Sequence, residues 1–354
     1  MRLPPLVRLL LWPVSVLYGV ITRWRAALYE KGVFKQRRLD RPVISVGNLT
    51  VGGTGKTPMV IWLAERFLAQ GKHVGILTRG YKGDAGSSDE VELMKCHLQG
   101  AMFGVGANRY EQGKKLEASV DLFLLDDGFQ HRALARDFDI VLVTPQDANN
   151  RLLPAGRLRE PVGSLRRADA VVLASGATVE AFGLEGECFD SGKSPLLAKD
   201  ARSGAPGSDS RKSPLLAKPA RSGAPTVSRQ RLIWRVRRGI VAQNVPLRPV
   251  VFCGIARPQN FVLQLRAAQV EPAAEAFYRD HHAYSEKDVR ELLALKQRSE
   301  AGGFVTTEKD AVNLGAFLSA LEPLAVVPVR MELADAANAL DTMLRTIEER
   351  SRNA

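Results

Sequence analysis

The amino-acid sequence predicts an α/β protein with two domains and an N-terminal helix. Three observations lead to this prediction. From Pro42 onward, short apolar runs alternate with amphipathic ones, which is typical of strands joined by helices. A glycine-rich stretch at 47–58 lies between the first expected strand and the first expected helix. Apolar residues also recur at helical spacing over the first 21 positions.

The composition is that of an ordinary globular protein. The 354 residues are 45% hydrophobic and 25% charged, which is enough apolar material for one large or two modest domains. The three cysteines, Cys96, Cys188 and Cys253, are far apart and form no CxxC pair. Their spacing fits a reducing compartment, and it argues against a disulfide framework and a cysteine-based zinc site.

Much of the positive charge lies at the N-terminus. The formal net charge is +12. The first 41 residues contain nine Lys and Arg residues against Glu30 and Asp40, so they contribute 9 − 2 = +7 of this charge. Such a segment is typical of contact with anionic lipid or nucleic acid, or of a solvated basic face. Charge alone does not choose between these interpretations.

The apolar residues of the same segment favour a membrane surface. The uncharged stretch 9–22 is too short to span a bilayer comfortably, and Pro13 interrupts it. Trp12, Tyr18 and Trp24 are of the types that favour the lipid–water interface. We expect residues 1–30 to form an interfacial anchor helix, peripheral or monotopic, on the cytoplasmic face. A helix packed on the core is the alternative; a signal peptide is disfavoured because no A-x-A site follows. The expected apolar face consists of Leu3, Leu6, Val7, Leu10, Val14, Leu17, Tyr18 and Ile21.

Two series of elements follow this helix. Residues 31–185 are expected to form the first domain, and residues 231–354 a smaller C-terminal α/β domain. The first has expected strands at 43–46, 73–78, 122–125, 140–143 and 170–174, and a helix at 58–70 that begins with Pro58 and ends before Gly71. The second has expected strands at 250–253, 304–306 and 325–329, and helices at 258–268, 285–297 and 334–350.

A duplicated segment separates the two expected domains. Residues 193–206 read KSPLLAKDARSGAP and residues 212–225 read KSPLLAKPARSGAP, so the copies differ at one position in fourteen. The Ser, Gly, Ala, Pro and Lys content favours a flexible surface excursion. We expect residues 186–230 to be an insertion without a catalytic role.

The glycine-rich stretch predicts a phosphate-binding loop. Residues 47–58 read GNLTVGGTGKTP, between an expected strand and an expected helix. Glycines let backbone N–H groups cradle phosphate oxygens; Lys56 would reach the β- and γ-phosphates, and the Thr57 hydroxyl can bind Mg²⁺. Thr50 stands where the GxxxxGK[ST] pattern has its first glycine, and a chance glycine-rich turn is the alternative. We expect a P-loop NTPase-like domain that binds ATP with Mg²⁺.

A second motif predicts a carboxylate for the metal. The apolar stretch 122–125 is followed directly by Asp126 and Asp127. A strand that ends in an aspartate is how P-loop enzymes deliver a carboxylate to magnesium. Two adjacent aspartates can also simply begin a turn. The phosphate-binding loop upstream favours the metal site.

Four motifs together resemble the tetraacyldisaccharide 4′-kinase family of lipid A biosynthesis. The resemblance runs from the N-terminal helix to the C-terminal domain and omits the duplicated segment, and the non-standard P-loop is the family's own form. It implies an inner-membrane enzyme with its active site between two α/β domains. Such an enzyme would transfer the γ-phosphate of ATP to the 4′-hydroxyl of a tetraacylated glucosamine disaccharide 1-phosphate, giving lipid IVA. The motifs are GNLTVGGTGKTP at 47–58, LTRGYKG at 77–83, DDGFQHR at 126–132 and TTEKDAVNL at 306–314.

The resemblance also implies roles for single residues. Asp89, in Ser-Asp-Glu, matches the family's catalytic aspartate, although Val91 replaces the usual proline after this motif. His281, in Asp-His-His, matches the histidine that supports it, and Lys56 would assist catalysis. The alternatives are a solvated loop carboxylate for Asp89 and a surface or capping pair for His281 and His282. ATP would be held by Thr50, Val51, Gly52, Gly53, Thr54, Gly55, Lys56 and Thr57, and the metal by Thr57, Asp126, Asp127 and, nearby, Glu160.

Two classes of function remain open. The first is a lipid-sugar kinase at the membrane, whose partners would be the acylated disaccharide and the membrane surface, without nucleic acid or an obligate protein partner. The second is an ATP-driven switch that acts on a protein or nucleic acid partner, with the basic segment as its docking patch. The histidine pair in the C-terminal domain favours the kinase, because phosphoryl transfer to a hydroxyl needs a base.

Overall fold

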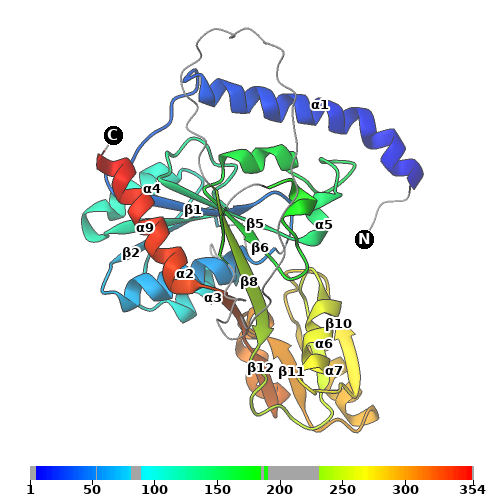
Figure 1. Cartoon of the computed structure of the whole chain (residues 1–354). Helices are drawn as coiled ribbons and strands as arrows, with labels where there is room; N and C mark the ends of the chain where they lie inside the picture. The colour runs from blue at the N-terminus through cyan, green and yellow to red at the C-terminus, as the bar shows by residue number, and fades with distance from the viewer. Residues whose placement is uncertain (1–4, 53, 81–88, 185–186, 190–230, 353–354) are drawn as a thin grey trace, which may run out of the picture.

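The computed structural model describes residues 5–52, 54–80, 89–184, 187–189 and 231–352, which form a larger and a smaller α/β unit (Figure 1). Gly53 and both copies of the duplicated segment lie outside the described residues. The larger unit contains a nine-stranded sheet in the order β13-β8-β6-β5-β1-β4-β2-β3, with β7 paired to β8. Its strands are β1 (Val43–Asn48), β2 (Val74–Thr78), β3 (Met102–Val105), β4 (Leu122–Asp126), β5 (Phe138–Val143), β6 (Ala170–Leu173), β7 (Glu187–Phe189), β8 (Leu232–Ile240) and β13 (Val329–Leu333).

The centre of this sheet forms because its strands are apolar on both faces. Every residue of β1, β2, β4, β5 and β6 is buried, as expected for parallel strands covered by helices on two sides. The carboxyl ends of β1 and β4 are adjacent, since Val46 is paired with Asp126. This register brings the glycine-rich loop and the paired aspartates to one edge of the sheet. The helices are α2 (Lys56–Ala69), α3 (Asp89–His97), α4 (Arg109–Leu116), α5 (Pro145–Ala148) and α9 (Ala336–Arg352).

The smaller unit has a four-stranded parallel sheet in the order β10-β9-β11-β12. A capping box in which Ser285 and Asp288 bond each other's backbone starts one of its helices, α7. Thr307 caps another, α8, through the backbone N–H of Asp310. The elements are β9 (Val250–Cys253), α6 (Pro258–Ala267), β10 (Ala274–Phe277), α7 (Glu286–Arg298), β11 (Phe304–Thr307), α8 (Glu308–Leu314) and β12 (Leu324–Val327).

The boundary of the smaller unit differs from the sequence-based expectation of 231–354. Strands β8 and β13 pair antiparallel and extend the larger sheet, so the chain enters and leaves the smaller unit through neighbouring strands. Helix α9 then packs on the larger unit, where Leu340 and Met343 join the same core as Trp62 of α2. The expected insertion 186–230 also begins differently, because Glu187–Phe189 is a strand that pairs with β8.

The N-terminal segment is a single helix, α1 (Pro5–Glu30), which continues through Pro13. It lies across the end of the larger unit that is away from the smaller one (Figure 1). One side of it contacts the segment 152–159: Ser15 Oγ donates to the carbonyl of Leu152 at 3.1 Å and accepts from the N–H of Ala155 at 2.9 Å. The Tyr18 hydroxyl donates to the carbonyl of Arg159 at 3.0 Å. Among the described residues, no helix has the length and apolarity needed to cross a membrane.

Candidate active site

A cavity of about 1210 Å³ lies between the two units. The larger unit lines it with the phosphate-binding loop, the first turn of α2, the end of β4 and the start of α3. The smaller unit lines it with residues 255–257, 280–283 and 307–309. The cleft between domains that the sequence predicts is therefore present, and all the described site residues except Thr50 and Glu160 line it.

The phosphate-binding loop is held open by glycine conformations and by a neighbouring strand-like segment. Gly52 and Gly55 adopt positive φ angles of 111° and 95°, which other residues rarely tolerate. The N–H of Val51 donates to the carbonyl of Arg157 at 2.9 Å, and Arg157 Nη2 donates back to the Val51 carbonyl at 2.7 Å. A side chain at Gly52 would collide with this guanidinium group. The loop is thus shaped before any phosphate binds.

Lys56 and Asp127 form a charged pair inside this loop. Lys56 Nζ lies 3.5 Å from Asp127 Oδ1 and donates to Asn48 Oδ1 at 3.3 Å. Arg159 binds both carboxylate oxygens of Asp127 at 2.7 Å. Burial opposes ionisation of Asp127, but the hydrogen bonds from Arg159 and the charge of Lys56 outweigh it and lower the pKa of Asp127 to about 2. Asp127 is therefore ionised and already balanced by two cations.

The pKa of Asp126 is shifted in the opposite direction to that of Asp127. It is 4% exposed, and Thr78 Oγ1 donates to its Oδ2 at 3.3 Å. Its Oδ1 is buried without a hydrogen-bond partner in the described part of the chain. Burial, followed by the charges of Glu90 and Asp127, raises the pKa of Asp126 to about 7. A buried carboxylate with an unsatisfied oxygen, next to a phosphate-binding loop, fits a site for a divalent cation.

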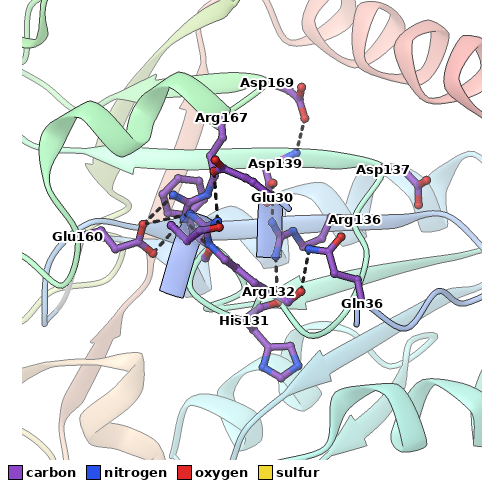
Figure 2. A network of polar contacts seen from close by, with 12 residues as sticks. Glu30, Gln36, His131, Arg132, Arg136, Asp137, Asp139, Glu160, Arg167 and Asp169 are labelled. Carbon is purple, nitrogen blue, oxygen red and sulfur yellow. Dashed lines mark hydrogen bonds and ion pairs between the residues drawn. The ribbon is translucent and has the colours of Figure 1, made fainter. Parts of the chain in front are cut away.

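Glu160 does not join the other expected metal ligands. Arg167 binds its two oxygens at 2.7 and 3.0 Å, and Arg132 lies 3.9 Å away. Figure 2 shows the Glu160 carboxylate joined to these guanidinium groups. Arg132 in turn contacts Glu30 of α1 at 3.5 Å, and Arg167 donates to the carbonyl of Phe129 at 3.0 Å. Glu160 does not line the cavity, and its oxygens are bound by arginine, so the structure does not bring it into the cavity with Asp126 and Asp127.

Asp89 and His281 meet across the cavity, although 192 positions separate them. His281 Nδ1 lies 2.8 and 2.9 Å from the two carboxylate oxygens of Asp89. Asp89 begins α3 rather than lying in a loop, and its side chain is 11% exposed. Burial opposes its ionisation, but the charge of Lys309 and the hydrogen bond from His281 outweigh this and lower the pKa of Asp89. His282 points elsewhere, since its Nε2 contacts Asp288 at 3.2 Å.

Several cavity residues carried no predicted role. Lys309 and Asn313 of α8 reach Asp89 Oδ2 at 3.5 and 3.4 Å. Gln130 donates to the carbonyl of Asn48 at 2.9 Å, beneath the phosphate-binding loop. Burial and the charges of nearby arginines lower the pKa of His131 to about 4, so its ring is neutral near pH 7. All four belong to the motifs DDGFQHR and TTEKDAVNL. Membership in these motifs is the sequence feature from which a role in the site could have been predicted.

Known proteins resemble this chain over nearly its whole length. The family model described as tetraacyldisaccharide-1-P 4′-kinase, LpxK, matches residues 7–348. A tetraacyldisaccharide 4′-kinase from Koribacter versatilis is 36% identical over 367 residues, covering 96% of this chain and 99% of the relative. One from Geobacter metallireducens is 36% identical over 352 residues, covering 93% and 95%.

A solved structure shares the fold. LpxK from Aquifex aeolicus, crystallised with ATP, is 28% identical with a TM-score of 0.68, and the match covers 96% of this chain and 99% of that one. The family model and both relatives cover nearly the whole of this chain. The chain belongs to the tetraacyldisaccharide-1-P 4′-kinase family.

Proposed function

We propose that the cavity between the two units transfers the γ-phosphate of ATP to the 4′-hydroxyl of a tetraacyldisaccharide 1-phosphate, giving lipid IVA. Family membership identifies the chain as a lipid A precursor kinase that uses ATP and Mg²⁺. The contact between Asp89 and His281 carries the assignment of the chemistry to this cavity. It places a carboxylate and an imidazole opposite a phosphate-binding loop, as transfer to a hydroxyl requires.

The phosphate-binding loop would hold the triphosphate. Backbone N–H groups of residues 51–55 and the start of α2 would face the phosphate oxygens, and Lys56 would move from Asp127 onto the β- and γ-phosphates. Arg159 remains with Asp127 during this change, so the carboxylate keeps one partner. Lys56 thus stabilises charge that develops on the transferred group, and Arg159 preserves the shape of the loop.

The carboxylate of Asp126 and the hydroxyl of Thr57 would hold the magnesium ion, with Asp127 close by. When bound, Mg²⁺ would neutralise negative charge on the β- and γ-phosphate oxygens. The unsatisfied Oδ1 of Asp126 supports this assignment. Glu160 has no part in it, since its oxygens are bound by Arg132 and Arg167.

Asp89 would accept the proton of the acceptor hydroxyl. The oxygen of that hydroxyl forms the new bond to the γ-phosphorus, the bond to the β-phosphate oxygen breaks, and ADP leaves with that electron pair. His281 orients the carboxylate through Nδ1. The charges around Asp89 keep it ionised, and so able to receive a proton, over the working pH range.

We also propose that α1 lies on the cytoplasmic face of the inner membrane, where the acyl chains of the substrate reside. Leu10 and Trp24 of α1 are 78% and 70% exposed. Arg23 and Arg25, on either side of Trp24 in the sequence, are also exposed, as expected for contacts with anionic headgroups. The membrane would then present the acceptor to the same enzyme that takes ATP from water.

A single assay tests the reaction. Purified protein is incubated with γ-³²P-labelled ATP, Mg²⁺ and a tetraacyldisaccharide 1-phosphate, and the lipid extract is separated. We expect label in the lipid at the 4′ position. ATP hydrolysis without labelled lipid, stimulated instead by a protein or nucleic acid partner, would favour the ATP-driven switch.

Sedimentation with vesicles tests the membrane contact. Removal of residues 1–25 should release most of the protein from vesicles that contain anionic lipid, while Arg23→Gln with Arg25→Gln should weaken binding mainly at low salt. The matched control is Arg237→Gln, an exposed arginine in β8. If the truncated protein sediments as fully as the whole chain, α1 is not the anchor.

A further inference from the structure

Lys309 lies beside both members of the proposed catalytic pair, Asp89 and His281. It is the second residue of α8, and its side chain is 17% exposed. Its ammonium group contacts Asp280 Oδ1 at 2.9 Å, His281 Nε2 at 3.3 Å and Asp89 Oδ2 at 3.5 Å. One cation therefore touches the imidazole, the carboxylate that faces that imidazole and a second carboxylate behind it.

The contact with Nε2 selects one form of the histidine ring. An ammonium group has only donors, so it meets a ring nitrogen that offers a lone pair. A neutral imidazole that accepts at Nε2 carries its proton on Nδ1. Nδ1 is the atom that faces Asp89 at 2.8 Å, and a carboxylate only accepts. Lys309 and Asp89 thus require the same tautomer from opposite sides of the ring.

The fold holds Lys309 and His281 through one buried residue. Asp310 is fully buried and accepts from the N–H of Gly254 at 2.6 Å, while the Thr307 hydroxyl donates to it at 2.5 Å. The carbonyl of Gly254 accepts from the N–H of His281 at 3.2 Å, in a turn where His281 has a φ of 60°. The start of α8 and the turn of His281 are therefore fixed to each other, and with them the distance from Lys309 to the ring.

We propose that Lys309 is a positioning residue that holds His281 with its proton on Nδ1, toward Asp89, and so leaves Asp89 as the group that takes the proton of the acceptor hydroxyl. The inference rests on the proposed function of the Asp89–His281 pair. With Nε2 occupied by Lys309, the ring has no lone pair for the substrate. The proton passes from the hydroxyl to the Asp89 carboxylate, and no proton leaves His281 in this step.

Removal of Lys309 also changes the pH at which the Asp89 carboxyl group ionises. The titratable and charged groups around Asp89 are Glu90 beside it in α3, His281 and Asp280 from the facing turn, and Lys309 from α8. Lys309 is the largest of the influences that lower the pKa of Asp89, against the effect of burial. Without it, the carboxyl group binds its proton at higher pH. The acid limb of the kcat/KM profile then moves to higher pH, which a merely structural role would not cause.

The first test uses kinetics of the full-length protein with ATP and the lipid acceptor. We expect Lys309→Met to lower kcat by roughly 10- to 100-fold, as misplacement of a catalytic group does. Its KM for ATP should stay within about twofold of wild type, because the contacts of its ammonium group are with Asp89, Asp280 and His281 rather than with the phosphate-binding loop. Lys309→Arg retains the cation and should recover much of the loss. Lys287→Met, whose side chain is 78% exposed on α7, is the matched control and should behave as wild type.

The second test reads the ring directly and does not depend on activity. Long-range ¹H–¹⁵N spectra of protein labelled at histidine distinguish the two tautomers, and His281→Gln assigns the signal. We expect an Nδ1-protonated ring in the wild type and a mixture in Lys309→Met. A wild-type ring protonated on Nε2, or an unchanged ring and kcat in Lys309→Met, would overturn the role of Lys309. Full activity in Asp89→Asn would instead overturn the proposed pair on which that role rests.

Discussion

The environment of Glu160 leads to a prediction that separates a structural role from a metal-binding one. Glu160 and Arg132 are 11% and 8% exposed, and Arg167 is 20% exposed, so Glu160→Leu would leave two largely buried guanidinium groups without their shared carboxylate. Removal of one partner from a buried ion pair costs about 3–5 kcal/mol. For a unit of this size, about 2–4 °C is lost per kcal/mol, which gives a fall in Tm of roughly 6–20 °C.

Thermal unfolding followed by circular dichroism measures this effect. Glu348→Leu, an exposed glutamate on α9, is the control and should change the Tm little. The double variant Glu160→Leu with Arg167→Met should be no less stable than Glu160→Leu alone, because it removes one of the two orphaned charges. In all of these variants, the Mg²⁺ concentration for half-maximal rate should stay near that of wild type. An unchanged Tm with a large rise in the Mg²⁺ requirement of Glu160→Leu would refute the reasoning and restore Glu160 to the metal site.

Three further predictions concern the cavity. Lys56→Ala should abolish activity by removing several kcal/mol of transition-state stabilisation, with little change in Tm; near-normal turnover by folded protein would contradict its phosphate role. Asp89→Ala and His281→Ala should each lower kcat by roughly 10²–10⁴, and the double variant should be little worse, whereas multiplicative losses would argue against a functional pair. Because the folded protein holds the pKa of His131 at about 4, below its ordinary 6.5, the unfolded chain takes up the proton first. The unfolding free energy should therefore fall as pH drops from about 6.5 to 4, less steeply in His131→Asn; equal slopes in urea titrations would contradict this.

The strands at the centre of the larger unit could be predicted because their apolar runs are continuous. The expected strand at 122–125 matches β4 within one residue, and that at 43–46 matches β1 except at its end. Strand β3 was missed because it is short and only Gly104 in it is fully buried, and β10 because it alternates between half-buried and exposed positions. Strand β8 was missed because three arginines interrupt its apolar residues, and this moved the domain boundary.

The site residues that could be predicted from the sequence alone are those that lie in short contiguous motifs. The phosphate-binding loop and the paired aspartates are contiguous motifs, so the sequence showed both. Asp89 and His281 were identified through a family resemblance, since no pattern indicates that residues 192 positions apart should touch. The same limit explains Glu160 and Lys309. The carboxylate of Glu160 forms ion pairs with Arg132 and Arg167. Lys309 contacts Asp89 only because α8 packs next to α3 in the folded protein.

The paired strands β8 and β13 also set the order in which the molecule can be completed during synthesis. The smaller unit has all its strands between Val250 and Val327, so it can fold as soon as that stretch leaves the ribosome. The larger unit begins first, but its core still lacks Met331 of β13 and Leu340 and Met343 of α9. Its apolar surface over α2 stays uncovered until the last residues are made. The half of the enzyme that is encoded first is therefore the half that is finished last.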